Sequence, residues 1–154
     1  MASKPLNSNI GLTLKRRIKA PPQKVYDAWT QPEKMIQWWG VGAMVGGKGG
    51  GKTPIAETDL RIGGRFRVQF WSQDGDHNSA SGEYREIVPG EKLVFSWSWQ
   101  STSERVSQVT LTFKPDGDAT MLTLLHEMFF DEKARDSHIR GWTAALDNLE
   151  GVFA

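Results

Sequence analysis

The clearest hydrophobic period in the chain lies in its last stretch, residues 131–154. Five apolar side chains recur there at spacings of three and four: Ile139, Trp142, Leu146, Leu149 and Phe153. This spacing predicts one face of an α-helix. An isolated amphipathic helix is marginal in water, so we expect this face to cover another part of the chain. Because Gly141 has only a hydrogen atom in place of a side chain, we expect it to allow another element to approach the helix closely.

Most of the preceding chain alternates apolar and polar residues with the period of two that is typical of half-buried strands. Seven segments carry the pattern: residues 10–18, 55–60, 65–71, 81–88, 92–100, 105–114 and 119–127. Tight-turn residues separate the last six, as in an antiparallel meander. Two short helices are expected after the first strand, one opened by Pro22 and one running from Pro32 or Glu33 to Trp38, with Thr30 as its cap.

Composition excludes several classes of protein. The chain has 154 residues, and its 19 basic and 18 acidic side chains leave a formal charge of +1, so nucleic acid and acidic membranes are not expected partners. There are no cysteines, and no apolar run reaches the roughly 18 residues of a membrane span. We therefore expect a single cytoplasmic domain over residues 1–154, either a monomer or a homodimer.

A glycine-rich segment at about residues 41–53 contains a formal match to a phosphate-binding loop. Gly46 to Thr53 reads GGKGGGKT and satisfies the Walker A pattern. A functional loop of that kind needs a buried strand before it and a helix directly after it. Here Pro54 and the strand-like Ile55 to Leu60 follow instead. We interpret the segment as a flexible surface loop, with nucleotide hydrolysis as the weaker alternative.

Several motifs are distributed over nearly the whole chain: Arg17 to Pro22, Pro32-Glu33, Trp38-Trp39-Gly40, Asp59 to Phe66, Gly82-Glu83-Tyr84, Leu93 to Trp97, His126-Glu127 and Gly141-Trp142. They resemble the START-like (SRPBCC) helix-grip superfamily, and within it the branch homologous to the activator of the heat-shock chaperone ATPase. The resemblance implies an α+β fold in which a curved antiparallel sheet of about seven strands, in the order β-α-α-β6-α, wraps around a long C-terminal helix. In many relatives a cavity between sheet and helix receives a hydrophobic small molecule.

Strand parity and the helix stripe supply candidate walls for such a cavity. They are Phe66, Val68, Phe70, Phe95, Trp97, Trp99, Leu111, Phe113, Leu124, His126, Trp142 and Leu146. The candidate ligand-binding residues are these without Trp99 and with the addition of Trp39 and Tyr84. Arg65 and Tyr84 are polar candidates for the rim. Each of these side chains can equally be ordinary core, because inward-facing apolar residues serve both purposes.

His126 is the histidine placed on an inward strand face, while its neighbour Glu127 points the other way. It is a weak catalytic candidate as an acid or base, and a buried structural histidine is the alternative. No metal or cofactor is expected, since no histidine pair has ligand spacing. Three functions stay open: a non-enzymatic binding module for a hydrophobic or amphipathic molecule, with a role in stress response; a cochaperone-like domain acting on a heat-shock chaperone ATPase; and a cyclase-like enzyme using His126.

Overall fold

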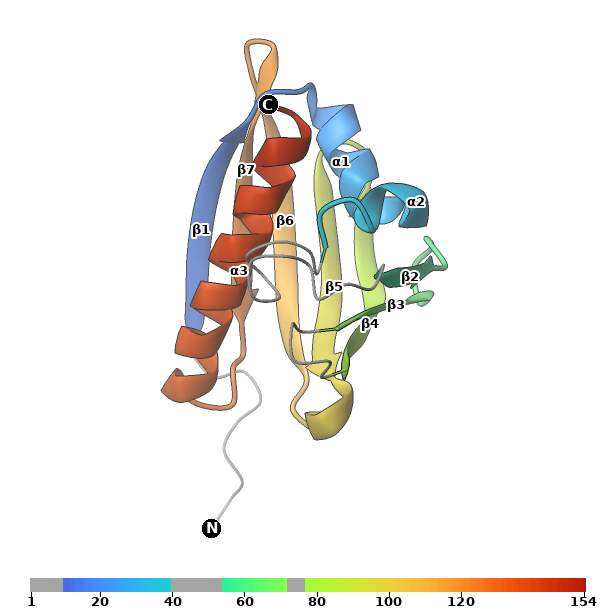
Figure 1. Cartoon of the computed structure of the whole chain (residues 1–154), viewed down its shortest axis with the longest axis vertical. Coiled ribbons are helices and arrows are strands. Elements are labelled where there is room, and N and C mark those ends of the chain that lie inside the picture. Colours follow the sequence, from blue (N-terminus) through green and yellow to red (C-terminus); the bar gives the residue numbers. More distant parts are fainter. Residues whose placement is uncertain (1–9, 40–53, 72–76) are drawn as a thin grey trace.

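The computed structural model describes residues 10–39, 54–71 and 77–154. Seven strands form one antiparallel sheet in the order β1-β7-β6-β5-β4-β3-β2. Helix α3 runs along one face of this curved sheet, and α1 and α2 lie beside it (Figure 1). The elements are β1 (Gly11–Ile18), α1 (Pro22–Thr30), α2 (Pro32–Met35), β2 (Ile55–Thr58), β3 (Arg65–Trp71), β4 (His77–Val88), β5 (Lys92–Trp99), a 3-10 turn (Gln100–Thr102), β6 (Ser107–Asp116), β7 (Ala119–Glu127) and α3 (Glu132–Val152). The α+β helix-grip fold is therefore confirmed.

Local chemistry explains where the last two strands turn. Asp116 pairs with Ala119 across the end of the β6–β7 hairpin. Gly117 occupies the loop between them with a φ of 63°, a value that glycine adopts without steric cost. The same region of φ is occupied by Met128 at 68°, directly after β7. That unusual backbone turn redirects the chain from the sheet into the connection to α3.

Helix α3 is fixed at both of its ends. At its start the Asp131 carboxylate accepts a hydrogen bond from the Ala134 backbone N–H at 2.8 Å, which caps the first turn. Toward its end Asp147 and Glu150 both accept from the Arg16 guanidinium of β1, each at 2.6 Å. Trp142, Leu146 and Leu149 lie buried against the sheet, as their spacing predicts.

Five local expectations are wrong. Helix α2 ends at Met35 instead of Trp38, and the Thr30 hydroxyl donates to the Tyr26 carbonyl instead of capping α2. Strand β2 ends at Thr58, and β4 begins at His77, four residues before the expected start. Gly141 does not serve a close crossing, because a Cβ there would meet no described atom within 4 Å.

Tryptophan dominates the core at the junction of the helices and the sheet. Trp38 is fully buried, and its indole donates to the Ala28 carbonyl at 3.0 Å. Rings of Trp29, Trp39, Trp97 and Trp142 pack around it or against one another at centroid distances between 4.7 and 5.9 Å. Such edge-on and tilted contacts are the preferred aromatic geometries.

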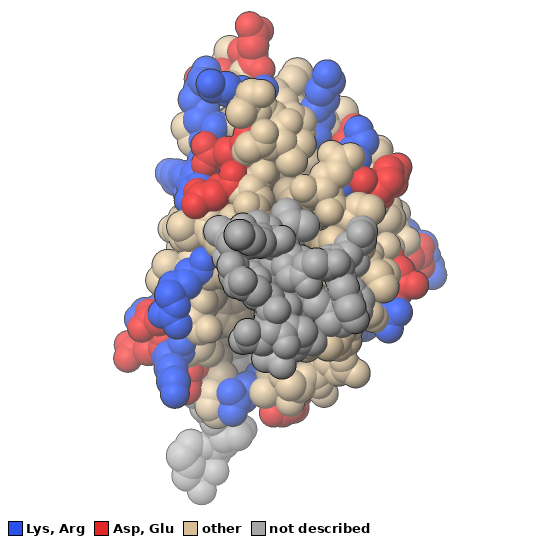
Figure 2. Space-filling model, in the orientation of Figure 1, with Lys and Arg blue, Asp and Glu red and all other residues tan. Residues whose placement is uncertain are grey.

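The outside of the protein carries both signs of charge. Figure 2 shows basic and acidic side chains intermixed over the visible face, with no large area of one sign. No helix in the described ranges is long and apolar enough to cross a membrane. The glycine-rich segment and its Walker-like match fall within residues 40–53, outside the described residues.

Candidate functional site

The thirteen candidate ligand-binding residues lie at the interface between the sheet and the helices, and each is at most 4% exposed. Trp39 follows α2, ten belong to strands β3 to β7, and Trp142 and Leu146 belong to α3. The parity that selected them therefore holds. Arg65 does not join them: it is exposed on the opposite face of β3 from Phe66. Their contact with a ligand stays a prediction.

One small cavity among the described residues touches these side chains. Its volume is about 10 Å³, and it is lined by Trp29, Met35, Trp39, Phe66, Tyr84 and Phe95. That is room for about one water molecule. Burial raises the pKa of the Tyr84 phenol, helped by the nearby Tyr26 and Asp59, so this hydroxyl stays protonated. The described residues thus pack the middle of the sheet–helix interface with aromatic rings.

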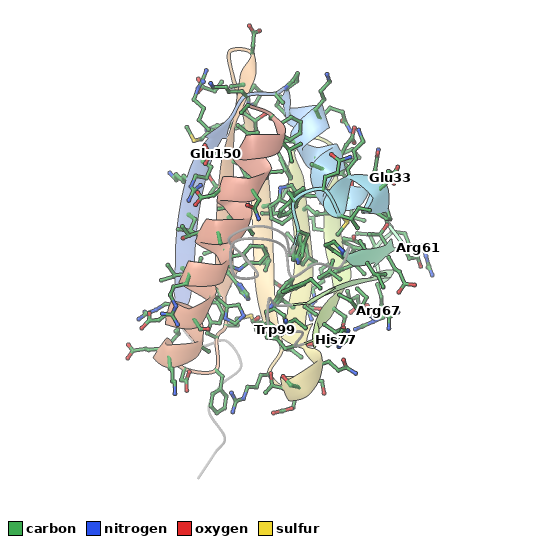
Figure 3. All side chains as sticks on the ribbon, in the orientation of Figure 1. Glu33, Arg61, Arg67, His77, Trp99 and Glu150 are labelled. Atoms are coloured by element: carbon green, nitrogen blue, oxygen red, sulfur yellow. The ribbon has the colours of Figure 1, made fainter. Side chains whose placement is uncertain are left out.

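A larger cavity, of about 210 Å³, lies at the end of the sheet where β5 finishes and α3 begins. Trp99, at the end of β5, marks this region in Figure 3. Its apolar surface comes from Trp97, Trp99, Phe129, Phe130 and the small Ala134 of α3. Its polar surface comes from Thr102, Arg105, Ser107, Ser137 and His138. Aromatic walls with a few convergent polar groups are typical of ligand sites.

His126 lies behind this cavity and not in its lining. Trp142 donates its indole N–H to Nδ1 of His126 at 2.9 Å, so Nδ1 carries the lone pair. The proton is thereby assigned to Nε2, which donates to the Ser107 Oγ at 2.7 Å. That hydroxyl in turn donates to the Trp97 carbonyl at 3.1 Å. Burial lowers the pKa of His126 well below its usual value, and the neighbouring His138 lowers it further.

His138 forms a second chain of hydrogen bonds, similar to that of His126. Its Nδ1 donates to the Ala134 carbonyl at 2.7 Å, which leaves Nε2 to accept from the Trp99 indole at 2.9 Å. Burial lowers the pKa of His138, although the hydrogen bond to Ala134 acts in the opposite direction. The Phe129 ring packs against both imidazoles, at centroid distances of 4.2 Å from His126 and 4.9 Å from His138. Two neutral imidazoles therefore support one wall of the cavity.

This arrangement limits the chemistry available to His126. A serine nucleophile needs a histidine nitrogen with a free lone pair to take its proton. Nε2, the nitrogen that faces Ser107, already carries a proton, and Nδ1 is engaged by Trp142. His126 and Ser107 are thus arranged as a structural hydrogen-bond chain. The described ranges contain no group of three side chains that could hold a metal ion.

Sequence reasoning found only Trp97 and Trp99 among the residues that line the larger cavity. Phe129 and Phe130 lie in the connection between β7 and α3, and Thr102 and Arg105 lie between β5 and β6. Residues in connections carry no periodic signal. The pair Phe129-Phe130, which follows β7 after one intervening residue, was the one available indication, because aromatic side chains carry large apolar areas that favour burial.

Most of the chain matches a known protein family. Residues 19–154 match the family described as Activator of Hsp90 ATPase homolog 1-like protein. The chain belongs to this family. No curated protein matches it at a significant level.

Solved structures of the same fold accompany the family match. A Chromobacterium violaceum protein is 23% identical with a TM-score of 0.77, covering 93% of this chain and 96% of its own. A Rhizobium leguminosarum protein is 26% identical with a TM-score of 0.71, covering 92% and 91%. CalU16 from Micromonospora echinospora is 28% identical with a TM-score of 0.65, covering 93% and 74%. The likeness extends over nearly the whole of this chain in each case.

Proposed function

We propose that this chain is a non-enzymatic binding module for a compact aromatic or amphipathic molecule, held between the sheet and the first turns of α3. The observation that carries the proposal is the cavity of about 210 Å³ with four aromatic side chains and several polar groups in its lining. Membership of the activator-like family supports a binding role for this interface.

The size of the cavity sets the size of the molecule. Sites for drug-sized ligands typically measure roughly 300–1,000 Å³, whereas an engineered cavity of about 150 Å³ accepts benzene. The value here lies between these two classes. A ligand with a single ring and a short substituent therefore fits better than a long lipid or a polycyclic molecule.

A purely binding role also agrees with the chemistry of the site. His126 and His138 are both neutral, and each uses both of its ring nitrogens within the protein. An acid or base poised for catalysis needs a pKa near the working pH and an accessible nitrogen. Unchanged turnover in a His126→Ala variant would remove the cyclase-like alternative, which these contacts do not favour.

The seven tryptophans give a direct assay, because each indole N–H yields its own signal in a nitrogen–proton NMR spectrum. We expect titration with benzamide or benzoate to shift the signals of Trp97 and Trp99, while that of Trp38, bonded to Ala28 in the core, stays in place. An Ala134→Phe variant fills the cavity and should abolish the shifts. Lys133→Phe, on the exposed side of the same helical turn, is the matched control and should bind normally.

Two results would contradict the proposal. One is the absence of any saturable shift with either probe. The other is unchanged binding by an Ala134→Phe variant whose remaining indole signals show that it is folded.

A cochaperone-like role is the second candidate, and the family match is the observation that favours it. If this role is correct, the purified chain should stimulate the ATPase of the Hsp90-type chaperone from its own source and should be retained with it on a column. A chaperone whose ATPase rate is the same with and without a saturating excess of the chain would exclude this role. The Ala134→Phe variant separates the two candidates, since filling the cavity should not affect chaperone stimulation.

A further inference from the structure

We infer that the cavity beside α3 selects an anionic ligand: a planar aromatic acid whose ring lies among Trp97, Trp99 and Phe129 and whose carboxylate lies at Arg105. This inference rests on the proposed function and adds the charge of the ligand to it. The residues that carry it are the polar members of the cavity lining.

Arg105 is the charged member of the described lining, and no Asp or Glu belongs to that lining. Its guanidinium lies 4.0 Å from the centre of the Phe130 ring, a stacked position that holds the group at the cavity. Its contact with Glu104 is long, at 3.9 Å, and its side chain is 43% exposed. The guanidinium N–H groups therefore remain available to a carboxylate, which they can bind in a bidentate manner.

The uncharged groups of the lining also offer donors. The hydroxyls of Thr102 and Ser137 make no hydrogen bond to any described residue. Each hydroxyl can therefore donate to a ligand carboxylate.

Two acceptors of the lining already have hydrogen-bond donors. Ser107 Oγ accepts from His126, and Nε2 of His138 accepts from Trp99. A cationic ligand would find no carboxylate in the described lining and would face Arg105, a repulsion that disfavours binding. Together, the available Arg105 guanidinium and the lack of a carboxylate in the described lining favour an anion over a neutral or cationic aromatic molecule.

The test compares three probes of nearly the same shape: benzoate, benzamide and benzylamine. Dissociation constants come from the indole signals of Trp97 and Trp99. Because Arg105 is partly exposed, its attraction is screened by water, and we expect benzoate to bind about two- to fivefold more tightly than benzamide at low salt. Benzylamine should bind more weakly than benzamide, and added salt should narrow the benzoate preference.

Substitution then assigns the preference to one residue. Arg105→Gln should bring the benzoate-to-benzamide ratio close to one. Arg85→Gln is the matched control: Arg85 is exposed and bonds Gln108 across β4 and β6, away from the cavity, so the ratio should persist.

The outcomes separate this inference from the function on which it rests. Equal affinities for benzoate and benzamide, or a preference that survives Arg105→Gln, would overturn the anionic ligand while leaving the cavity as a binding site. No binding of any probe would remove both the inference and the proposed function.

Discussion

Acidification should destabilise this protein at a pH where most carboxylates are still ionised, and His126 is the main reason. Its ring is fully buried in the neutral form between Trp142 and Ser107, so its pKa in the folded chain lies well below the ordinary value of 6.5. In the unfolded chain the same ring takes up a proton as the pH falls through about 6.5. The unfolded state therefore binds more protons, and the stability of the fold decreases as the pH is lowered.

The magnitude follows from that difference. The stabilisation is fully present well above pH 6.5 and is lost at about 1.4 kcal/mol per pH unit below it, until the folded pKa is reached. Between about pH 7.5 and about pH 5.5 the loss from His126 is about 1.4 kcal/mol. For a chain of this length that corresponds to a fall in Tm of about 3–6 °C. His138 acts in the same direction, because burial lowers its pKa as well.

Urea unfolding followed by circular dichroism, repeated across this pH range, measures the effect. A His126→Gln variant should be less stable at every pH, yet its stability should fall by about 1.4 kcal/mol less than that of the wild type over these two pH units. If His126→Gln keeps the full wild-type slope, the reasoning about a buried neutral imidazole is refuted.

Two further substitutions test individual hydrogen bonds. Ser107→Ala leaves the buried Nε2–H of His126 without its acceptor and should lower the free energy of unfolding by about 1–3 kcal/mol. Ser98→Ala, on the outer face of β5, is the control and should change it by less than about 0.5 kcal/mol. Equal effects of the two substitutions would contradict the hydrogen bond between His126 and Ser107. Asp131→Ala removes the cap of α3 and should lower the free energy of unfolding by about 1 kcal/mol, or Tm by about 2–4 °C. Asp131→Asn keeps a capping oxygen and should retain most of the stability. An equal loss of stability in both variants would argue against the cap.

Residue periodicity was sufficient to predict the sheet, the closing helix and the inward faces. The alternation through Phe66, Val68 and Phe70 places these side chains correctly because one face of the sheet is buried and the other is in water. The stripe through Trp142 and Leu146 succeeds for the same reason on α3. The face of a strand or helix that is buried can be predicted because the residues that mark it are close together in the sequence.

The cavity beside α3 was not predictable in the same way. It depends on contacts between distant positions, such as the hydrogen bond from Trp99 to His138, thirty-nine residues apart, and on residues in connections. The turn at Met128 also has no sequence signal, because a positive φ is unfavourable for methionine and is imposed by the surrounding structure. The filling of the central interface by indoles is likewise a property of three-dimensional packing, which composition alone does not specify.

The most direct test of the binding role is a crystal structure of the chain grown in the presence of benzoate. Our account predicts an ordered benzoate in the cavity beside α3, with its ring among Trp97, Trp99 and Phe129 and its carboxylate at Arg105. A structure in which this cavity holds only water, while benzoate is ordered elsewhere or nowhere, would contradict it.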